Sequence, residues 1–68
     1  MTIAYDDKTD LLHIRLDDRP QEVTNRRVSD DVVLDLGTGD RIVGIEIVNA
    51  SHNVDLGRLL PVRTEGVR

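Results

Sequence analysis

The feature that most limits the fold of this chain is a pair of apolar, β-branched runs separated by a short glycine-rich break. Residues 32–36 are Val-Val-Leu-Asp-Leu, residues 37–40 are Gly-Thr-Gly-Asp, and residues 41–48 are Arg-Ile-Val-Gly-Ile-Glu-Ile-Val. Alternating β-branched residues are typical of strands, and glycines between two such runs indicate a hairpin. The sequence therefore predicts two antiparallel strands, with Val43, Ile45 and Ile47 in one apolar stripe.

Other parts of the chain show weaker patterns. Residues 2–6 and 11–16 alternate like strands and are separated by an aspartate-rich turn. Residues 21–29 are polar and fit either an edge strand or an extended connection, so both alternatives stay open. After Asn49 the β pattern stops, and the sequence predicts one short helix that ends before Pro61.

These segments together predict a mainly β domain of the α+β class. We expect an antiparallel β-meander of four or five strands, with a short C-terminal helix packed on one face. The 68 residues leave room for one domain only. That domain is expected to span residues 1–61, and residues 62–68 are expected to form a frayed tail.

The composition gives this small domain few means of stabilisation. The absence of Cys excludes disulfides and thiolate metal sites, and the absence of Phe and Trp leaves a core of Val, Ile and Leu. A domain of this length is marginally stable alone, and oligomerisation is the remaining common remedy. Because one short helix covers only one face of a sheet, we expect a homodimer in which a second copy covers the other face. Apolar residues occupy that second face of the predicted strands as well: Leu11, Val33, Ile42 and Val48.

Charge and hydropathy bear on partners and location. The net charge of −4 disfavours binding to a phosphate backbone. Arg26 and Arg27 form the basic pair of the central segment, and a DNA-binding regulator using them is the weakest alternative. No apolar run approaches the roughly 20 residues that cross a bilayer, and the first residues do not resemble a signal peptide. We therefore expect a cytoplasmic protein without a membrane partner.

The candidate residues for a polar site are His13, Arg15 and Glu46. His13 and Arg15 both point away from the main apolar stripe of their strand, and Glu46 is the carboxylate within an otherwise apolar strand. We expect Glu46 to pair with Arg15 across the sheet. Alternatively, apolar surroundings raise the pKa of such a carboxylate, which then serves as a general acid. No residue is assigned as catalytic, cofactor-binding or metal-ligating on this pattern.

Two other features have mainly structural interpretations. Asp6 and Asp10 flank the first turn, where we expect them to accept hydrogen bonds from local amides rather than hold a cation. Gly44 lies inside a predicted strand, which indicates a bulge or the close approach of another group.

Several of these segments, taken in order, resemble a family of short, mostly bacterial proteins called domain of unknown function 2283. The resemblance rests on Tyr-Asp at 5–6, Leu-His-Ile-Arg-Leu at 12–16, Val-Gly-Ile-Glu-Ile at 43–47 and Ala-Ser at 50–51. The chain departs from the family pattern at His13, where an aromatic residue is usual, and at the hairpin turn, which is usually more acidic. The resemblance implies a β-meander with no established activity or catalytic residue. It also implies an antitoxin-like role for this chain, with a toxin-like partner protein encoded by a neighbouring gene.

Two classes of function follow. The leading hypothesis is a non-enzymatic, homo-oligomeric protein-interaction module without a cofactor. The alternative is a small-ligand or metal-binding domain with weak hydrolase-type activity, built from His13, Glu46 and the turn that carries Asp6 and Asp10. The alternative requires these side chains to converge in space.

Overall fold

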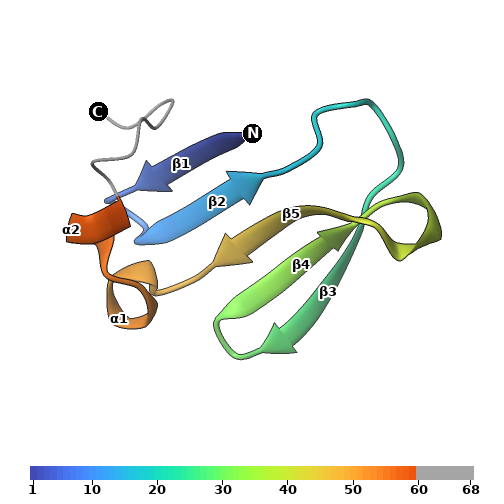
Figure 1. The fold of residues 1–68 in the computed structure, drawn as a ribbon. Helices are drawn as coiled ribbons and strands as arrows, with labels where there is room; N and C mark the ends of the chain where they lie inside the picture. Colours follow the sequence, from blue (N-terminus) through green and yellow to red (C-terminus); the bar gives the residue numbers. More distant parts are fainter. Residues whose placement is uncertain (60–68) are drawn as a thin grey trace.

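The sheet of this protein is built from two units that are separate in the sequence (Figure 1). The computed structural model describes residues 1–59. Five strands form one antiparallel sheet in the order β1-β2-β5-β4-β3, which confirms the predicted fold class. Strands β3, β4 and β5 form a consecutive meander, and the β1–β2 hairpin joins it along β5. The bounds are β1 (Thr2–Asp6), β2 (Leu11–Arg15), β3 (Thr24–Ser29), β4 (Val32–Leu36) and β5 (Ile42–Ile47).

The segment whose structure the sequence left open divides into a connection and a strand. Residues 24–29 form β3, an exposed strand at one edge of the sheet. The preceding residues belong to a connection that leads from β2, in the first unit, to this far edge (Figure 1). Arg26 and Arg27 therefore lie on an edge strand, where charged side chains discourage pairing with other chains.

The register between β4 and β5 contains a bulge. Asp35 lies opposite Gly44, but the next pair is Leu36 with Ile42, so Val43 is the extra residue of β5. Val43 is buried and lines a polar pocket with His13 and Glu46. The predicted stripe was wrong at this position, because the bulge interrupts the two-residue alternation on which the prediction depended.

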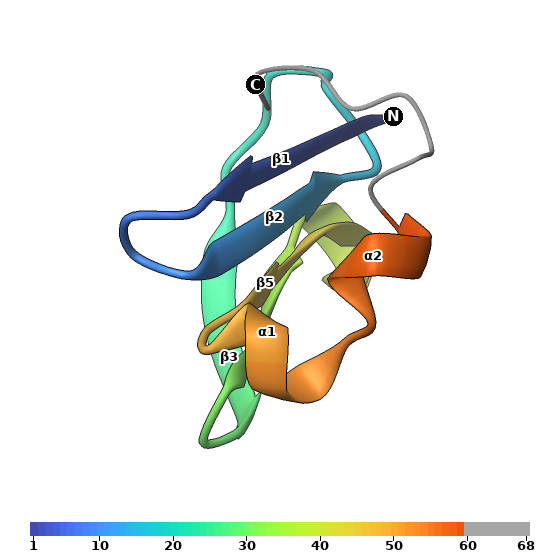
Figure 2. The ribbon, with the colours of Figure 1, turned by 90° about the vertical axis from the view of Figure 1, so that its left-hand side faces the viewer.

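The predicted single helix is divided into α1 (Ala50–Asn53) and α2 (Leu56–Leu59). The division falls at Val54, whose backbone is extended. Both helices lie on the same side of the sheet (Figure 2). They complete a core around Ile3, Leu12 and Ala50, packed by partly buried residues of the strands and helices: Tyr5, Ile14, Ile47, Val54, Leu56 and Leu59.

The turn aspartate Asp10 fastens the helical segment to the first hairpin. Its carboxylate accepts hydrogen bonds from the Ser51 amide at 3.0 Å, the Ser51 hydroxyl at 2.7 Å and the Tyr5 hydroxyl at 2.8 Å. The Ser51 amide lies in the first turn of α1, where backbone donors lack partners inside the helix. Asp10 thereby supplies a cap from a distant part of the chain.

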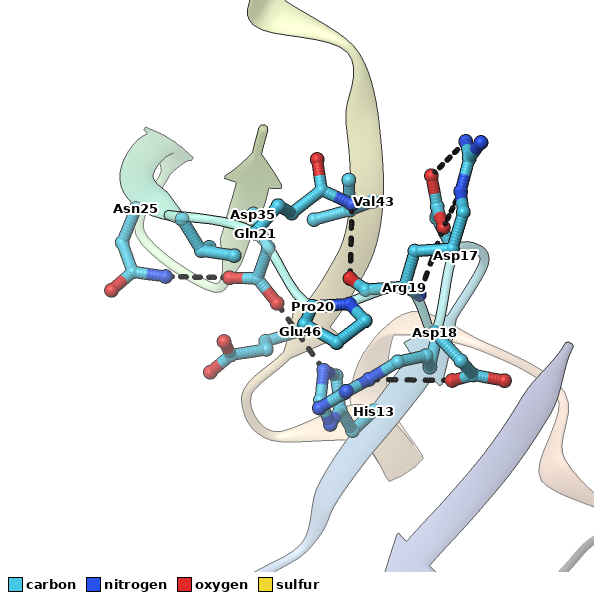
Figure 3. A pocket seen from close by; sticks show the side chains of 12 residues that line it. His13, Asp17, Asp18, Arg19, Pro20, Gln21, Asn25, Asp35, Val43 and Glu46 are labelled. Atoms are coloured by element: carbon cyan, nitrogen blue, oxygen red, sulfur yellow. Dashed lines mark hydrogen bonds and ion pairs between the residues drawn. The ribbon is translucent and has the colours of Figure 1, made fainter. Parts of the chain in front are cut away.

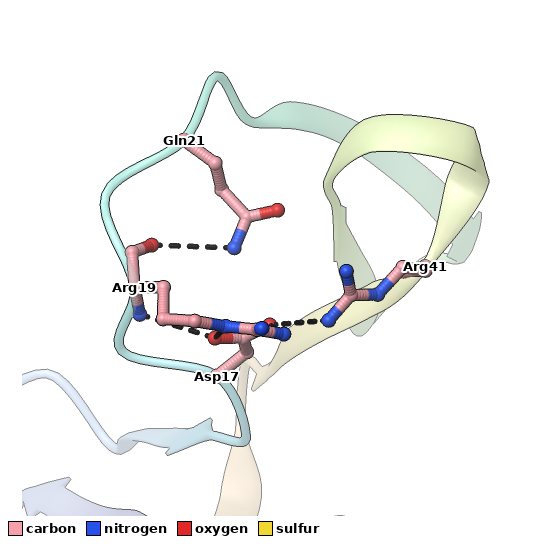
Figure 4. Close-up of polar contacts among 4 residues, drawn as sticks. All are labelled: Asp17, Arg19, Gln21 and Arg41. Carbon is pink, nitrogen blue, oxygen red and sulfur yellow. Dashed lines mark hydrogen bonds and ion pairs between the residues drawn. The ribbon is translucent and has the colours of Figure 1, made fainter.

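The connection from β2 to β3 lies at one end of the opposite face. Asp17 holds it in place by accepting from Arg19 and, at 2.8 Å, from Arg41 just before β5 (Figure 4). Pro20, Gln21 and Val23 of this connection line the same pocket as Val43. The chain itself thus covers part of the face that we expected a second copy to cover.

The predicted domain end at residue 61 and the predicted tail at 62–68 lie outside the described residues. Among residues 1–59, no helix has the length and apolar character needed to cross a membrane.

Candidate functional site

Three adjacent strands bring His13, Asp35 and Glu46 to one side of the sheet (Figure 3). His13 of β2 lies directly opposite Glu46 of β5, and Asp35 of β4 lies opposite Gly44, two residues from Glu46 along β5. One ligand-type atom from each side chain lies within 4.8 Å of the others. Of the side chains that the alternative hypothesis required to converge, His13 and Glu46 therefore do so, whereas Asp6 and Asp10 do not join them.

Gly44 makes this convergence sterically possible. It lies opposite both Arg15 on β2 and Asp35 on β4. A β-carbon at position 44 would lie 2.8 Å from Asp35 Oδ2 and 3.4 Å from His13 Nε2. The Asp35 carboxylate occupies the space that a side chain at position 44 would fill. The close approach that the sequence indicated at Gly44 is confirmed, whereas the extra residue of the bulge is its neighbour Val43.

Asp35 is the buried centre of the cluster, with 7% of its surface exposed. Its Oδ2 lies 3.2 Å from His13 Nε2, and its Oδ1 accepts a hydrogen bond of 2.6 Å from the Asn25 side-chain amide. The Asn25 bond fixes the carboxylate plane and leaves Oδ2 directed at His13. An outer hydrogen bond of this kind is what orients a carboxylate for a ligand.

The third member, Glu46, has a shifted pKa. Its hydrogen-bonded contact with the Asp35 carboxyl, together with burial and the negative charge of Asp35, raises the pKa of Glu46 above its ordinary value. His13 acts in the opposite direction, as a nearby positive charge would. The ionised form of Glu46 is therefore disfavoured beside Asp35.

The predicted ion pair between Glu46 and Arg15 was wrong. The register places His13, not Arg15, opposite Glu46, and Arg15 lies opposite Gly44. The Arg15 guanidinium instead lies 3.9 Å from Asp18, with both side chains more than half exposed. A difference of two residues along β2 decides the partner, and the register between β2 and the distant strand β5 could not be seen in the sequence.

The cluster lies in a pocket of about 310 Å³ between the sheet and the β2–β3 connection (Figure 3). Such a volume is at the lower end of the range for small-molecule sites. The lining is mixed in charge, and it contains all three candidate residues from the sequence: His13, Arg15 and Glu46.

Asp6 and Asp10 lie apart from this cluster and are occupied locally. The Asp6 carboxylate accepts the Lys8 amide, as expected for a turn. Asp10 bonds to Tyr5 and Ser51, and these hydrogen bonds hold the pKa of Asp10 below its ordinary value. Neither residue lines the pocket or belongs to the cluster with His13. The structure therefore joins His13, Arg15 and Glu46 in one place and leaves the turn carboxylates in another.

Asp35 and Asn25 were not among the candidate site residues predicted from the sequence. Asp35 lies between Leu34 and Leu36 just as Glu46 lies between two isoleucines, so the same argument applies to both carboxylates. The pairing of Asp35 with Gly44 depends on the bulge, which the sequence pattern does not reveal. Asn25 belongs to the segment whose strand character stayed open, and nothing in its local sequence distinguishes it.

The fold and site define a class: a small antiparallel sheet domain, capped by two short helices, with a polar pocket on the face away from them. Over residues 2–51 the chain matches the family model described as "Protein of unknown function (DUF2283)", and it belongs to that family. The match confirms the resemblance drawn from the sequence. No curated protein and no solved structure matches the chain.

Proposed function

We propose that this protein is a metal-binding domain, which holds one divalent transition-metal ion through His13, Asp35 and Glu46. The observation that carries the proposal is the convergence of their ligand atoms within 4.8 Å, from three strands of one sheet. Strands hold their side chains in a fixed register, so little ordering is needed when an ion binds.

The spacing fits such an ion. His13 Nε2 and Asp35 Oδ2 are 3.2 Å apart. Two ligands at metal distances of about 2.0–2.1 Å and near-tetrahedral angles are themselves separated by about 3.3 Å. The Glu46 side chain reaches the same point by rotating its carboxylate, since it is only partly buried.

The donor types select the class of metal. Imidazole together with carboxylates suits Zn²⁺, Mn²⁺, Fe²⁺ or Co²⁺, whereas Ca²⁺ favours an all-oxygen shell. A divalent ion also neutralises the two carboxylates whose proximity raises the pKa of Glu46. Three protein ligands leave a position for water, as in catalytic metal sites, and weak hydrolase-type activity therefore belongs to the same proposal.

The test is calorimetric titration with Zn²⁺ of the metal-stripped wild type and of Asp35→Asn. We expect one ion per chain in the wild type and at least about tenfold weaker binding in the variant, because a neutral amide is a poor metal ligand. Asp18→Asn is the matched control: it removes an exposed carboxylate from the mouth of the same pocket and is expected to leave the affinity unchanged. The proposal fails if the wild type does not saturate at one ion, or if both variants bind alike.

We further propose, as a second function, assembly into a homodimer that presents a protein-interaction surface. Its support is the small core and the exposure of Val23 and Val28, which are 48% and 53% exposed at and beside the edge strand β3. Size-exclusion chromatography with light scattering tests it at micromolar concentration. A dimer mass that falls to the monomer mass in Val28→Lys supports this function, and a monomeric wild type excludes it.

A further inference from the structure

We infer that the pocket over the metal ion takes a small oxyanion, bound by the ion and by the guanidinium of Arg15. This inference rests on the proposed metal site and names the ligand class of that site. By oxyanion we mean a small ligand that carries a phosphate or a carboxylate group.

The charge count favours an anion. A divalent ion bound by ionised Asp35 and Glu46 forms a neutral centre that still has open coordination positions. Arg15 adds a positive charge on the same side of the sheet, two residues along β2 from His13. An anion that joins the ion to a guanidinium forms charge-assisted hydrogen bonds, which are stronger than bonds between neutral groups.

Arg15 is available for this role, whereas Arg19 in the same pocket is not. The Arg19 guanidinium donates twice to Asp17, at 2.7 and 2.9 Å, which also raises the pKa of Arg19. Arg15 is half exposed and its contact with Asp18 is 3.9 Å long. A pair of this length between exposed groups is weak, so the side chain can turn to a ligand at little cost.

The size of the pocket limits the ligand. A volume of about 310 Å³ holds a small molecule and excludes a folded macromolecule. The lining also contains Asp18, whose negative charge opposes an anion, but this carboxylate is 64% exposed and is screened by solvent. The positive charges of the ion and of Arg15 together exceed the negative charge of Asp18.

The experiment uses the Co²⁺-loaded chain, because an anion that enters the coordination shell changes the visible spectrum of Co²⁺. Co²⁺ affinity is measured first, and the loaded protein is then titrated separately with inorganic phosphate and with acetate. We expect a saturable spectral change with at least one anion and about tenfold weaker anion binding in Arg15→Gln, at unchanged Co²⁺ affinity. Arg26→Gln, which removes an exposed charge on β3 outside the pocket, is expected to behave as the wild type.

The outcomes separate the two proposals. If Co²⁺ does not bind, the metal site itself is refuted, and the oxyanion inference falls with it. If Co²⁺ binds but neither anion changes the spectrum, or if Arg15→Gln binds the anion as the wild type does, only the oxyanion inference is overturned. A response to phosphate alone or to acetate alone supports the inference and identifies the headgroup.

Discussion

Asp35 and Gly44 face each other on β4 and β5, and the Asp35 carboxylate reaches His13 on β2 by passing over the glycine. The polar cluster therefore depends on the absence of a side chain as much as on the presence of three. A glycine inside a strand weakens that strand, and here the open space serves the site.

Gly44→Ala is expected to damage the site and the fold together. The new β-carbon would lie 2.8 Å from Asp35 Oδ2 and 3.2 Å from the Ile14 carbonyl oxygen, which belongs to the backbone and cannot move aside easily. We expect the free energy of unfolding to fall by about 1–3 kcal/mol, as for other overpacked positions. Zn²⁺ affinity should fall by at least about tenfold, because Asp35 is displaced. Urea unfolding and calorimetric titration measure the two effects.

Gly39→Asn is the control for that substitution. Gly39 has a φ of 69°, and a β-carbon added there would have no other atom within 4 Å. Asparagine tolerates this left-handed conformation. Its effect on metal affinity should be negligible. Equal losses of affinity in the two glycine variants would contradict the role given to Gly44.

Leu12→Ala tests the core under the helices. Leu12 is fully buried and packs with Ile3 and Ala50, so its truncation leaves a cavity between the sheet and α1. We expect a loss of about 2–5 kcal/mol in the free energy of unfolding. Leu16→Ala, at a position that is 43% exposed, should change it by less than about 0.5 kcal/mol. Chemical denaturation measures the free energy of unfolding of both variants. Similar decreases in the two variants would contradict the placement of the core around Leu12.

The strands could be predicted from the sequence because alternation of apolar residues is a local property. The pattern located β1, β2, β4 and β5 to within about a residue at their ends, and Asp10 was correctly placed in turn chemistry. It did not give the order of all five strands, since strand order depends on contacts between distant segments.

The candidate site was predictable only in part for a related reason. His13, Arg15 and Glu46 were recognised as polar residues on one face, and all three line the pocket. The pairing of Glu46 with His13 rather than with Arg15 was not, because the register between β2 and β5 joins segments that are distant in the sequence. Asp35 became visible as a member only when the register between β4 and β5 was known.

Asp10→Asn is expected to weaken the fold at neutral pH and much less in acid. Hydrogen bonds from Ser51 and Tyr5 lower the pKa of Asp10 in the folded chain below its ordinary value of 3.8. A carboxyl with a lowered folded pKa stabilises the fold above its unfolded pKa, and that stability is lost as the pH falls through the folded pKa. The difference between wild type and variant should therefore be full at pH 7 and shrink below about pH 4.

Urea unfolding at a series of pH values follows this difference. Asp7→Asn removes a charge from the same turn and serves as the control. A gap between wild type and Asp10→Asn that is constant from pH 7 to pH 2 would show that the Asp10 charge is not what holds α1.

Glu46→Gln should stabilise the metal-free protein at neutral pH. Asp35 raises the pKa of Glu46 in the folded chain above its ordinary value of 4.5, and His13 opposes this only in part. A raised folded pKa gives stability that is present below the unfolded pKa and is lost as the pH rises through the folded pKa. The uncharged variant avoids this loss.

Thermal unfolding in the presence of a chelator checks the prediction. The melting temperature of the wild type should decline relative to that of Glu46→Gln as the pH is raised from 4 towards 7. If the wild type is the more stable of the two at pH 7 without metal, the two carboxylates do not repel one another as their geometry indicates. With Zn²⁺ added the order should reverse, since a ligand that binds only the folded state stabilises it.

The strand order has a consequence for how the molecule assembles. Within residues 1–59, the pairs β1–β2, β3–β4 and β4–β5 join neighbours in the chain, whereas β2 with β5 joins residues 12–15 to residues 44–47. Local hairpins close small loops and are expected to form early. The pair β2–β5 is expected to form later, after the β1–β2 hairpin and the β3–β5 meander. His13 belongs to the β1–β2 hairpin, and Asp35 and Glu46 belong to the β3–β5 meander. An ion held by all three side chains would therefore crosslink these two units. If the chain were cleaved between β2 and β3, the two fragments would bind each other with higher affinity in the presence of the ion than in its absence.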